Sequence, residues 1–203
     1  MRMMHLIYAI LLVFGLTSSQ LASGGDLVPA EKVITTLHTQ LLVAMQLPKN
    51  TPPLERIKLI APTINSNFDF STIARIIMDK SWDALPKENK KTFEAVLRKL
   101  SVATYASHFS KFTGEYFVVI KVQNKKKLTI VDTQLVPLEG LPVSLKYLLK
   151  KNNNKWQIIN VIAQGVSDLA LKRAEYAYIL KNEGFESLIS QLNAKITRLE
   201  KTN

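Results

Sequence analysis

The chain has 203 residues, no cysteine, and 27 Lys and Arg residues against 16 Asp and Glu residues, which gives a formal net charge of +11. The missing cysteines exclude disulfide bonds and a thiol nucleophile, so the folded chain depends on packing alone. The positive charge favours an anionic partner such as a lipid surface, a nucleic acid or an acidic protein. A basic protein with no electrostatic task has the same composition.

The first residues have the layout of a secretory signal peptide. Arg2 is followed by an apolar run at 6–16, LIYAILLVFGL, and then by small and polar residues. A membrane-spanning helix needs about 20 apolar residues, so this run is too short to cross a bilayer comfortably. We therefore predict a signal peptide over 1–24 and a single exported domain over 25–203, which argues against a nucleic-acid partner. Cleavage after Ser19, an uncleaved anchor and a buried helix are the alternatives.

Helical periodicity dominates the first half of the predicted domain. Apolar residues at three-to-four spacing predict four helices, over residues 29–45, 54–64, about 69–82 and 87–111. Asp69 and Ser71 are the candidate N-caps of the third helix, and Pro86 opens the fourth. Phe68 and Trp82 are expected in the core.

After Gly114 the pattern changes to β-branched and aromatic runs. These runs predict four strands, over residues 115–122, 128–134, 143–149 and 156–163. Short charged turns join the strands, so we expect an antiparallel meander. Ser167 is the predicted cap of a helix over 168–182, and Gly184 separates it from a last helix over 185–201. This order predicts an α+β fold with N-terminal helices, a four-stranded antiparallel twisted sheet and two C-terminal helices.

The sequence carries no recognisable catalytic motif. It contains no G-x-S-x-G, P-loop or G-x-G-x-x-G pattern. His38 and His108 lack an acidic neighbour at ligand spacing; His38 is expected to be a partly exposed surface residue, and His108 a structural or surface residue. We therefore predict no catalytic residue, no metal site and no cofactor. An enzyme that uses His108 with a carboxylate is the alternative.

The C-terminal third is the most distinctive part of the chain. Its marks are Trp156, Gly165-Val166-Ser167, Lys172-Arg173, Tyr176, Gly184 and the closing run at 188–192, LISQL. Upstream, FDF at 68–70, Ala74-Arg75, Trp82, Phe93 and Thr104-Tyr105-Ala106 precede them in order. Together these residues resemble the MlaC family, also called the toluene-tolerance auxiliary family, over nearly all of the predicted domain. Three positions depart from the family pattern: Asp79 for a common Gly, Asn160 for Asp, and Asp168 for an apolar residue.

The resemblance implies a periplasmic phospholipid carrier without covalent chemistry. Helices then cover a twisted sheet, with acyl chains in an apolar cavity between the two layers. The implied partners are a phospholipid, an inner-membrane ABC transporter with its substrate-binding subunit, and an outer-membrane lipoprotein–porin complex, and the chain is expected to be a monomer. The implied role is to maintain outer-membrane lipid asymmetry. A carrier of another lipid, such as a hopanoid, and an interaction module with a filled core are the alternatives.

Two groups of side chains are the candidate site. The apolar candidates for contact with acyl chains are Phe70, Ile73, Ile77, Leu97, Leu100, Tyr105, Val118, Ile120, Ile130, Leu145, Tyr147 and Val161. The alternation of the strands leaves open which face points inward. The candidates for headgroup contact or docking are Lys172, Arg173, Lys125, Lys126 and Lys127. For these cations, solvation and the protection of sheet edges are the alternative roles.

Overall fold

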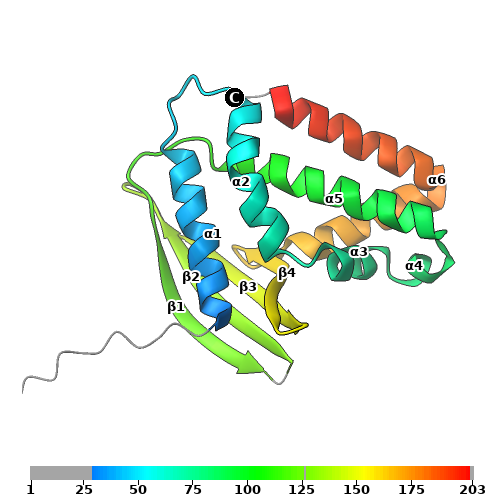
Figure 1. The fold of residues 1–203 in the computed structure, drawn as a ribbon, viewed down its shortest axis with the longest axis horizontal. Helices are drawn as coiled ribbons and strands as arrows, with labels where there is room; N and C mark the ends of the chain where they lie inside the picture. Colours follow the sequence, from blue (N-terminus) through cyan, green and yellow to red (C-terminus); the bar gives the residue numbers. More distant parts are fainter. Residues whose placement is uncertain (1–28, 126, 202–203) are drawn as a thin grey trace, which may run out of the picture.

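The computed structural model describes residues 29–125 and 127–201, so the predicted signal peptide and Lys126 lie outside the described residues. Helices precede the sheet, and one long kinked helix follows it (Figure 1). The helices are α1 (Pro29–Met45), α2 (Pro53–Asn67), α3 (Phe70–Met78), α4 (Lys80–Ala84), α5 (Lys87–His108) and α6 (Asp168–Lys201). The strands are β1 (Tyr116–Lys125), β2 (Leu128–Val136), β3 (Val143–Asn152), β4 (Lys155–Ala163) and β5 (Val166–Ser167).

The strands form one antiparallel sheet in the order β1-β2-β3-β4-β5. Its inner face is buried under the helices and carries Thr129, Val131, Thr133, Leu145, Tyr147 and Leu149. The intervening residues of β2 and β3 are half-buried or exposed and face away from the helices. The burial of residues thus alternates with a period of two, so one side of the sheet is covered by the helices and the other faces solvent, as in other antiparallel sheets with one solvated face.

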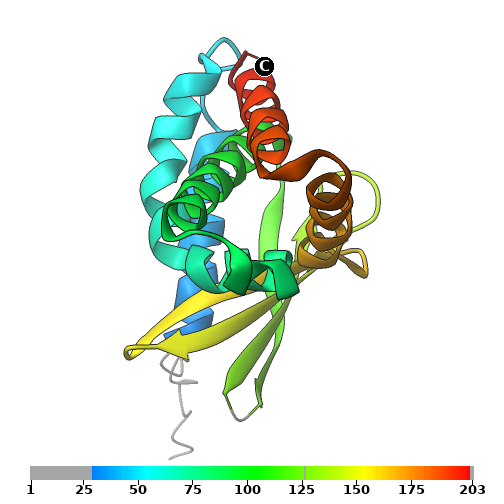
Figure 2. The ribbon, with the colours of Figure 1, turned by 90° about the vertical axis from the view of Figure 1, so that its right-hand side faces the viewer.

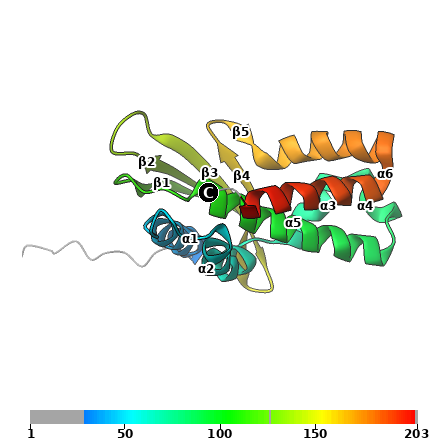
Figure 3. The same ribbon diagram turned by 90° about the horizontal axis from the view of Figure 1, so that it is seen from above.

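The helices form a layer that covers the sheet and extends past it. α1 lies along β1, β2 and β4, while α5 packs between α2 and α6. α5 and α6 continue well beyond the strands (Figure 3). In Figure 2, α5 and the first segment of α6 lie on opposite sides of the view, with strands running between and below them.

The predicted α+β class is confirmed, but the sheet has five strands instead of four. β5 is only two residues long and pairs with Ile162 and Ala163 of β4. Gln164 and Gly165 form the connecting turn with positive φ angles of 50° and 80°. Two residues are too few for a periodic pattern, so the sequence signal at this point is that of a loop before a cap. The two predicted C-terminal helices are the two segments of α6, which meet at Gly184 (φ 85°, ψ 177°).

Asp69 caps α3, as predicted, and also ties the helix to the sheet. Its carboxylate accepts hydrogen bonds from the Thr72 N–H at 2.9 Å and from the Thr72 hydroxyl at 2.6 Å. The Asn152 amide donates to the same carboxylate, and the Asp69 N–H donates to the Ile158 carbonyl at 3.0 Å. The start of α3 is therefore anchored on the β3–β4 hairpin, which positions its next turn at the edge of the inner face.

The helix predicted to run to about Trp82 is divided at Asp79. Asp79 has φ 46° and ψ −123°, a conformation that disfavours side chains and separates α3 from α4. It is also the position where the family that the sequence resembles commonly has Gly. The Asp79 carboxylate forms an ion pair with Arg173 of α6, and about half of each side chain is exposed. Such a pair contributes at most about 1 kcal/mol.

We expect Asp79→Gly to stabilise an Arg173→Ala chain by about 1 kcal/mol, because glycine relieves the backbone strain and the ion pair is already absent. Urea unfolding of the single and double variants measures this difference. Asp79→Ala in the same Arg173→Ala background is the matched control, because alanine keeps the unfavourable φ. Equal stabilities of the glycine and alanine variants would show that the backbone at residue 79 is not strained.

Candidate lipid-binding cavity

A cavity of about 330 Å³ lies between the helix layer and the sheet. Its walls come from α3 and α5, from β2, β3 and β4, and from the first turns of α6. The apolar lining consists of Phe68, Ile73, Leu97, Tyr105, Phe109, Leu135, Val143, Leu145, Tyr147, Ile159, Val161, Ala163 and Leu169. The polar lining consists of Ser101, Thr104, His108, Asn160, Asp168 and Lys172. Ligand pockets span about 300–1,000 Å³, so the volume lies at the lower end of that range.

Seven of the candidate residues line this cavity: Ile73, Leu97, Tyr105, Leu145, Tyr147, Val161 and Lys172. They come from five elements, α3, α5, β3, β4 and α6, which meet only in the folded chain. Leu145 and Tyr147 point inward from β3, and Val161 pairs with Tyr147 in the neighbouring strand. The inner face of the sheet, which the sequence left open, is therefore the face that carries these three residues.

Phe70, Ile77 and Leu100 lie outside the cavity lining and are buried in the hydrophobic core. On α3, the buried face carries Phe70 and Ile77. Ile73 is only half-buried and borders the cavity. The guanidinium of Arg98 covers the Phe70 ring at 4.7 Å from its centroid. The apolar residues of α3 therefore have two roles, which depend on where the helical period places them: Phe70 and Ile77 belong to the core, and Ile73 lines the cavity.

Val118, Ile120 and Ile130 are also absent from the cavity lining. A β-bulge interrupts the β1–β2 register between Val119 and Lys121, so Ile120 has no partner and is 57% exposed. Val118 and Ile130 lie opposite Gln134 and Gln123, on the face of the sheet that points away from the helices. One extra residue in a strand changes which side chains face inward, and no feature of the sequence marks it.

Several lining residues were not among the candidates. Phe68, expected in the core, is buried and also borders the cavity. Its ring lies 5.6 Å from that of Tyr105, and Tyr105 stacks on Phe109 at 5.8 Å. On α5, the lining positions 97, 101, 104, 105 and 108 follow helical spacing. This stripe mixes apolar and polar residues, which hid it from a search for apolar periodicity.

Beneath the cavity, His38 holds the hydroxyl of Tyr147. Its Nε2 lies 3.1 Å from the Tyr147 oxygen, and its ring stacks on Phe117 with centroids 3.8 Å apart. The expectation that His38 is a surface residue is wrong, because it is only 4% exposed. Burial lowers the pKa of His38 to about 3 and raises the pKa values of Tyr105 and Tyr147. These three groups are therefore uncharged at neutral pH, which suits an apolar ligand.

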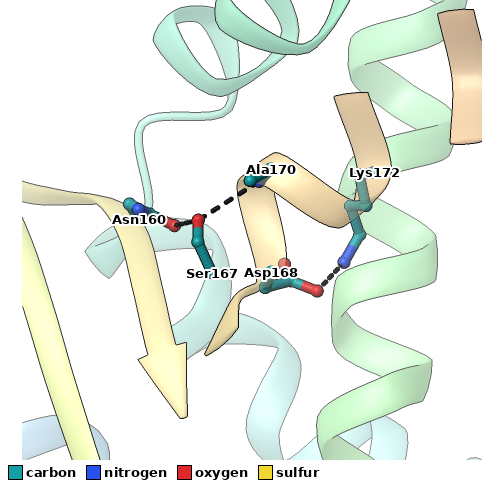
Figure 4. A network of polar contacts seen from close by, with 5 residues as sticks. All are labelled: Asn160, Ser167, Asp168, Ala170 and Lys172. Carbon is teal, nitrogen blue, oxygen red and sulfur yellow. Dashed lines mark hydrogen bonds and ion pairs between the residues drawn. The ribbon is translucent and has the colours of Figure 1, made fainter. Parts of the chain in front are cut away.

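Polar side chains gather at one side of the cavity, where β4 meets α6 (Figure 4). The Ser167 hydroxyl donates to the Asn160 side-chain oxygen at 3.2 Å and accepts from the Ala170 N–H at 3.1 Å, which caps α6. Asp168 forms an ion pair with Lys172 one turn later. Asn160 and Asp168, two of the departures from the family pattern, thus support the start of α6.

The remaining basic candidates lie away from the cavity lining. Arg173 pairs with Asp79 and is half-exposed. Lys125 and Lys127 are exposed at the β1–β2 hairpin. Within the described residues, no group of three or more His, Asp and Glu side chains is placed to hold a metal ion. None of the described helices has both the length and the hydropathy needed to span a membrane.

The family described as MlaC protein matches residues 35–194, well over half of this chain. The chain belongs to the MlaC family. A solved structure with the same fold is that of a phospholipid-binding protein from Ralstonia solanacearum in complex with a phospholipid. The two structures superpose with a TM-score of 0.75 at 18% sequence identity, covering 86% of this chain and 100% of that one. At this identity, the likeness establishes a shared fold.

Proposed function

We propose that this protein is a periplasmic carrier that holds the acyl chains of a phospholipid in the cavity between its helices and its sheet. The observation that carries the proposal is the apolar cavity itself, lined from α3, α5, three strands and α6. Membership of the MlaC family and the phospholipid complex of the Ralstonia protein support it. The filled core expected of a pure interaction module does not match this cavity.

The energy of acyl-chain transfer explains why most of the lining is apolar. Each methylene group removed from water contributes about 0.8 kcal/mol, so two chains of a phospholipid represent on the order of 20 kcal/mol. A carrier that exchanges lipid with a bilayer must therefore offer a similarly dry environment. Of the ionisable groups around the cavity, Tyr105 and Tyr147 are kept neutral by burial, and Asp168 and Lys172 neutralise each other.

Lys172 is the candidate contact for the lipid headgroup. It borders the cavity, and its side chain is 19% exposed, so the ammonium group lies between the apolar lining and solvent. Its ion pair with Asp168 orients it at the start of α6. We propose that a phosphate at this rim competes with Asp168 for Lys172, because an ammonium group binds phosphate as a point charge.

The carrier role also requires partners at two membranes. We propose that the protein receives and delivers lipid between an outer-membrane lipoprotein–porin complex and an inner-membrane ABC transporter with its substrate-binding subunit, and so maintains lipid asymmetry. Support comes from the family and from the net charge of +11, which favours docking on anionic surfaces. Lys125 and Lys127 at the exposed hairpin are the docking candidates.

Native mass spectrometry of the chain purified from a periplasmic extract tests the proposal, together with identification of the lipid released from it. We expect one phospholipid per chain, and we expect its transfer to vesicles that carry the transporter to slow when Lys125, Lys126 and Lys127 are neutralised. A hopanoid in place of the phospholipid would change the cargo but keep the carrier role. A bare mass that persists after incubation with phospholipid vesicles would reject the carrier.

A further inference from the structure

A second cavity, of about 720 Å³, lies at the C-terminal end of α1. It forms where the α1–α2 connection meets the segment that joins α5 to β1, near the upper end of α1 in Figure 1. Its lining consists of Met45, Gln46, Leu47, Pro48, Lys49, Arg56, Ser110, Lys111, Phe112 and Thr113. It shares no residue with the lipid-binding cavity, although Phe109 lines that cavity and the next residue, Ser110, lines this one.

Arg56 is the unusual residue of this second cavity because it is 3% exposed. Its Nε–H donates to the Ala44 carbonyl at 3.3 Å, which caps the end of α1. The adjacent acid, Glu55, forms its ion pair with Lys58 at 2.9 Å instead. Within the described part of the chain, no carboxylate pairs with Arg56, and its other N–H groups have no hydrogen-bond partner.

Among the described residues the only buried side-chain N or O atom without a partner is the Tyr176 hydroxyl oxygen, so the free N–H groups of Arg56 reach solvent in the cavity, where an anion can contact them. Here the surroundings add positive charge: Lys49 and Lys111 also line the cavity, and no Asp or Glu does. The carboxylate of Glu115 accepts from the Thr113 N–H at 2.6 Å and from its hydroxyl at 2.9 Å, so it is already bound. Three cationic side chains therefore line this space against one adjoining carboxylate, that of Glu115 on Thr113, which leaves an excess of positive charge.

We propose that this second cavity binds a phosphate group. A guanidinium presents a planar fork that matches phosphate oxygens, and two ammonium groups supply further charge for a dianion. Gln46 and Ser110 add hydrogen-bond donors that have no partner among the described residues. Phe112, which is 41% exposed, together with Met45, Leu47 and Pro48, forms an apolar wall for the organic part of a phosphate ester.

Titration of the purified chain with inorganic phosphate tests the site by calorimetry. Replacing both exposed lysines, Lys49→Ala with Lys111→Ala, is expected to weaken phosphate binding about tenfold. The matched control is Lys80→Ala with Lys87→Ala, which removes the same charge from exposed residues of α4 and α5. Arg56→Gln is expected to weaken binding by at least about thirtyfold, with thermal melting to confirm that this chain folds.

Absence of phosphate binding by the unaltered chain, or equal binding by the two lysine double variants, overturns the proposal. Titrating lipid-free and phospholipid-loaded protein separates two sources of the phosphate. If the loaded phospholipid blocks inorganic phosphate, its headgroup is the natural occupant; if both bind together, the occupant is a free phosphate or phosphate ester. Both results support the site. If the protein binds phosphate but no lipid, the carrier role fails while the phosphate site stands. Failure of the carrier role is therefore distinguishable from failure of the phosphate site.

Discussion

A Val161→Trp chain is expected to bind phospholipid about fiftyfold more weakly than the unaltered protein, because the indole displaces about three methylene groups at about 0.8 kcal/mol each. Val161 is half-buried, lines the cavity and lies opposite Tyr147 in the β3–β4 register. Its side chain points into existing space, so the larger residue fills the cavity and leaves the core in place. Lipid that remains bound after purification, measured by mass spectrometry, gives the loss directly.

Ile162→Trp is the matched control for this experiment. Ile162 is the next residue of β4, pairs with Lys146, and is absent from the cavity lining. The same change in size there tests tolerance of the strand to tryptophan without filling the cavity. Thermal melting of both variants shows whether they fold. Equal loss of lipid from the two variants would mean that acyl chains occupy a different space.

Acidification is expected to destabilise the protein through His38. Its pKa is lowered from 6.5 to about 3 in the folded chain, so the folded state stays neutral there while the unfolded chain takes up a proton. The contribution of His38 to stability is complete above pH 6.5 and is lost as the pH falls from 6.5 toward 3. The loss approaches about 1.4 kcal/mol per pH unit, so we expect about 2 kcal/mol between pH 7.5 and pH 5.

The comparison of His38→Gln with the unaltered chain isolates this effect from the titration of other groups. Glutamine preserves a hydrogen bond to the Tyr147 hydroxyl but does not titrate, so the difference in free energy of unfolding between the two pH values should shrink by about 2 kcal/mol. His108→Gln, at an exposed position, is the control and should preserve the full difference. Urea unfolding at both pH values supplies the measurement. An unchanged pH dependence in His38→Gln would show that His38 is protonated in the folded chain.

Local patterns in the sequence predicted most of the elements correctly. The helices follow apolar spacing of three to four residues, and the Asp69 cap is confirmed because capping depends on a few adjacent atoms. The strands follow period two, so the meander is also as predicted. The predicted elements are wrong where the local signal is short or absent. These places are β5, which has two residues, and Asp79, where the predicted third helix is divided into α3 and α4.

The candidate site was only partly predictable, for a physical reason. Which neighbour buries a side chain is decided only when the chain is packed. Phe70, Ile73 and Ile77 are all large apolar residues of one predicted helix, yet Phe70 and Ile77 lie in the core and Ile73 lines the cavity. His38 illustrates the same limit: polar Thr39 and Gln40 follow it, yet the Tyr147 hydroxyl and the Phe117 ring, both far along the chain, hold it in the interior.

The sequence by itself determined the α+β class, the antiparallel meander and the resemblance to the MlaC family, because these depend on periodicity, turns and the order of short motifs. Only the tertiary structure decided which strand face lines the cavity, that the bulge at Ile120 turns this side chain outward, and that Arg56 is buried without a counter-ion. Register and burial arise from contacts between residues far apart in the chain, and these contacts leave no local trace in the sequence.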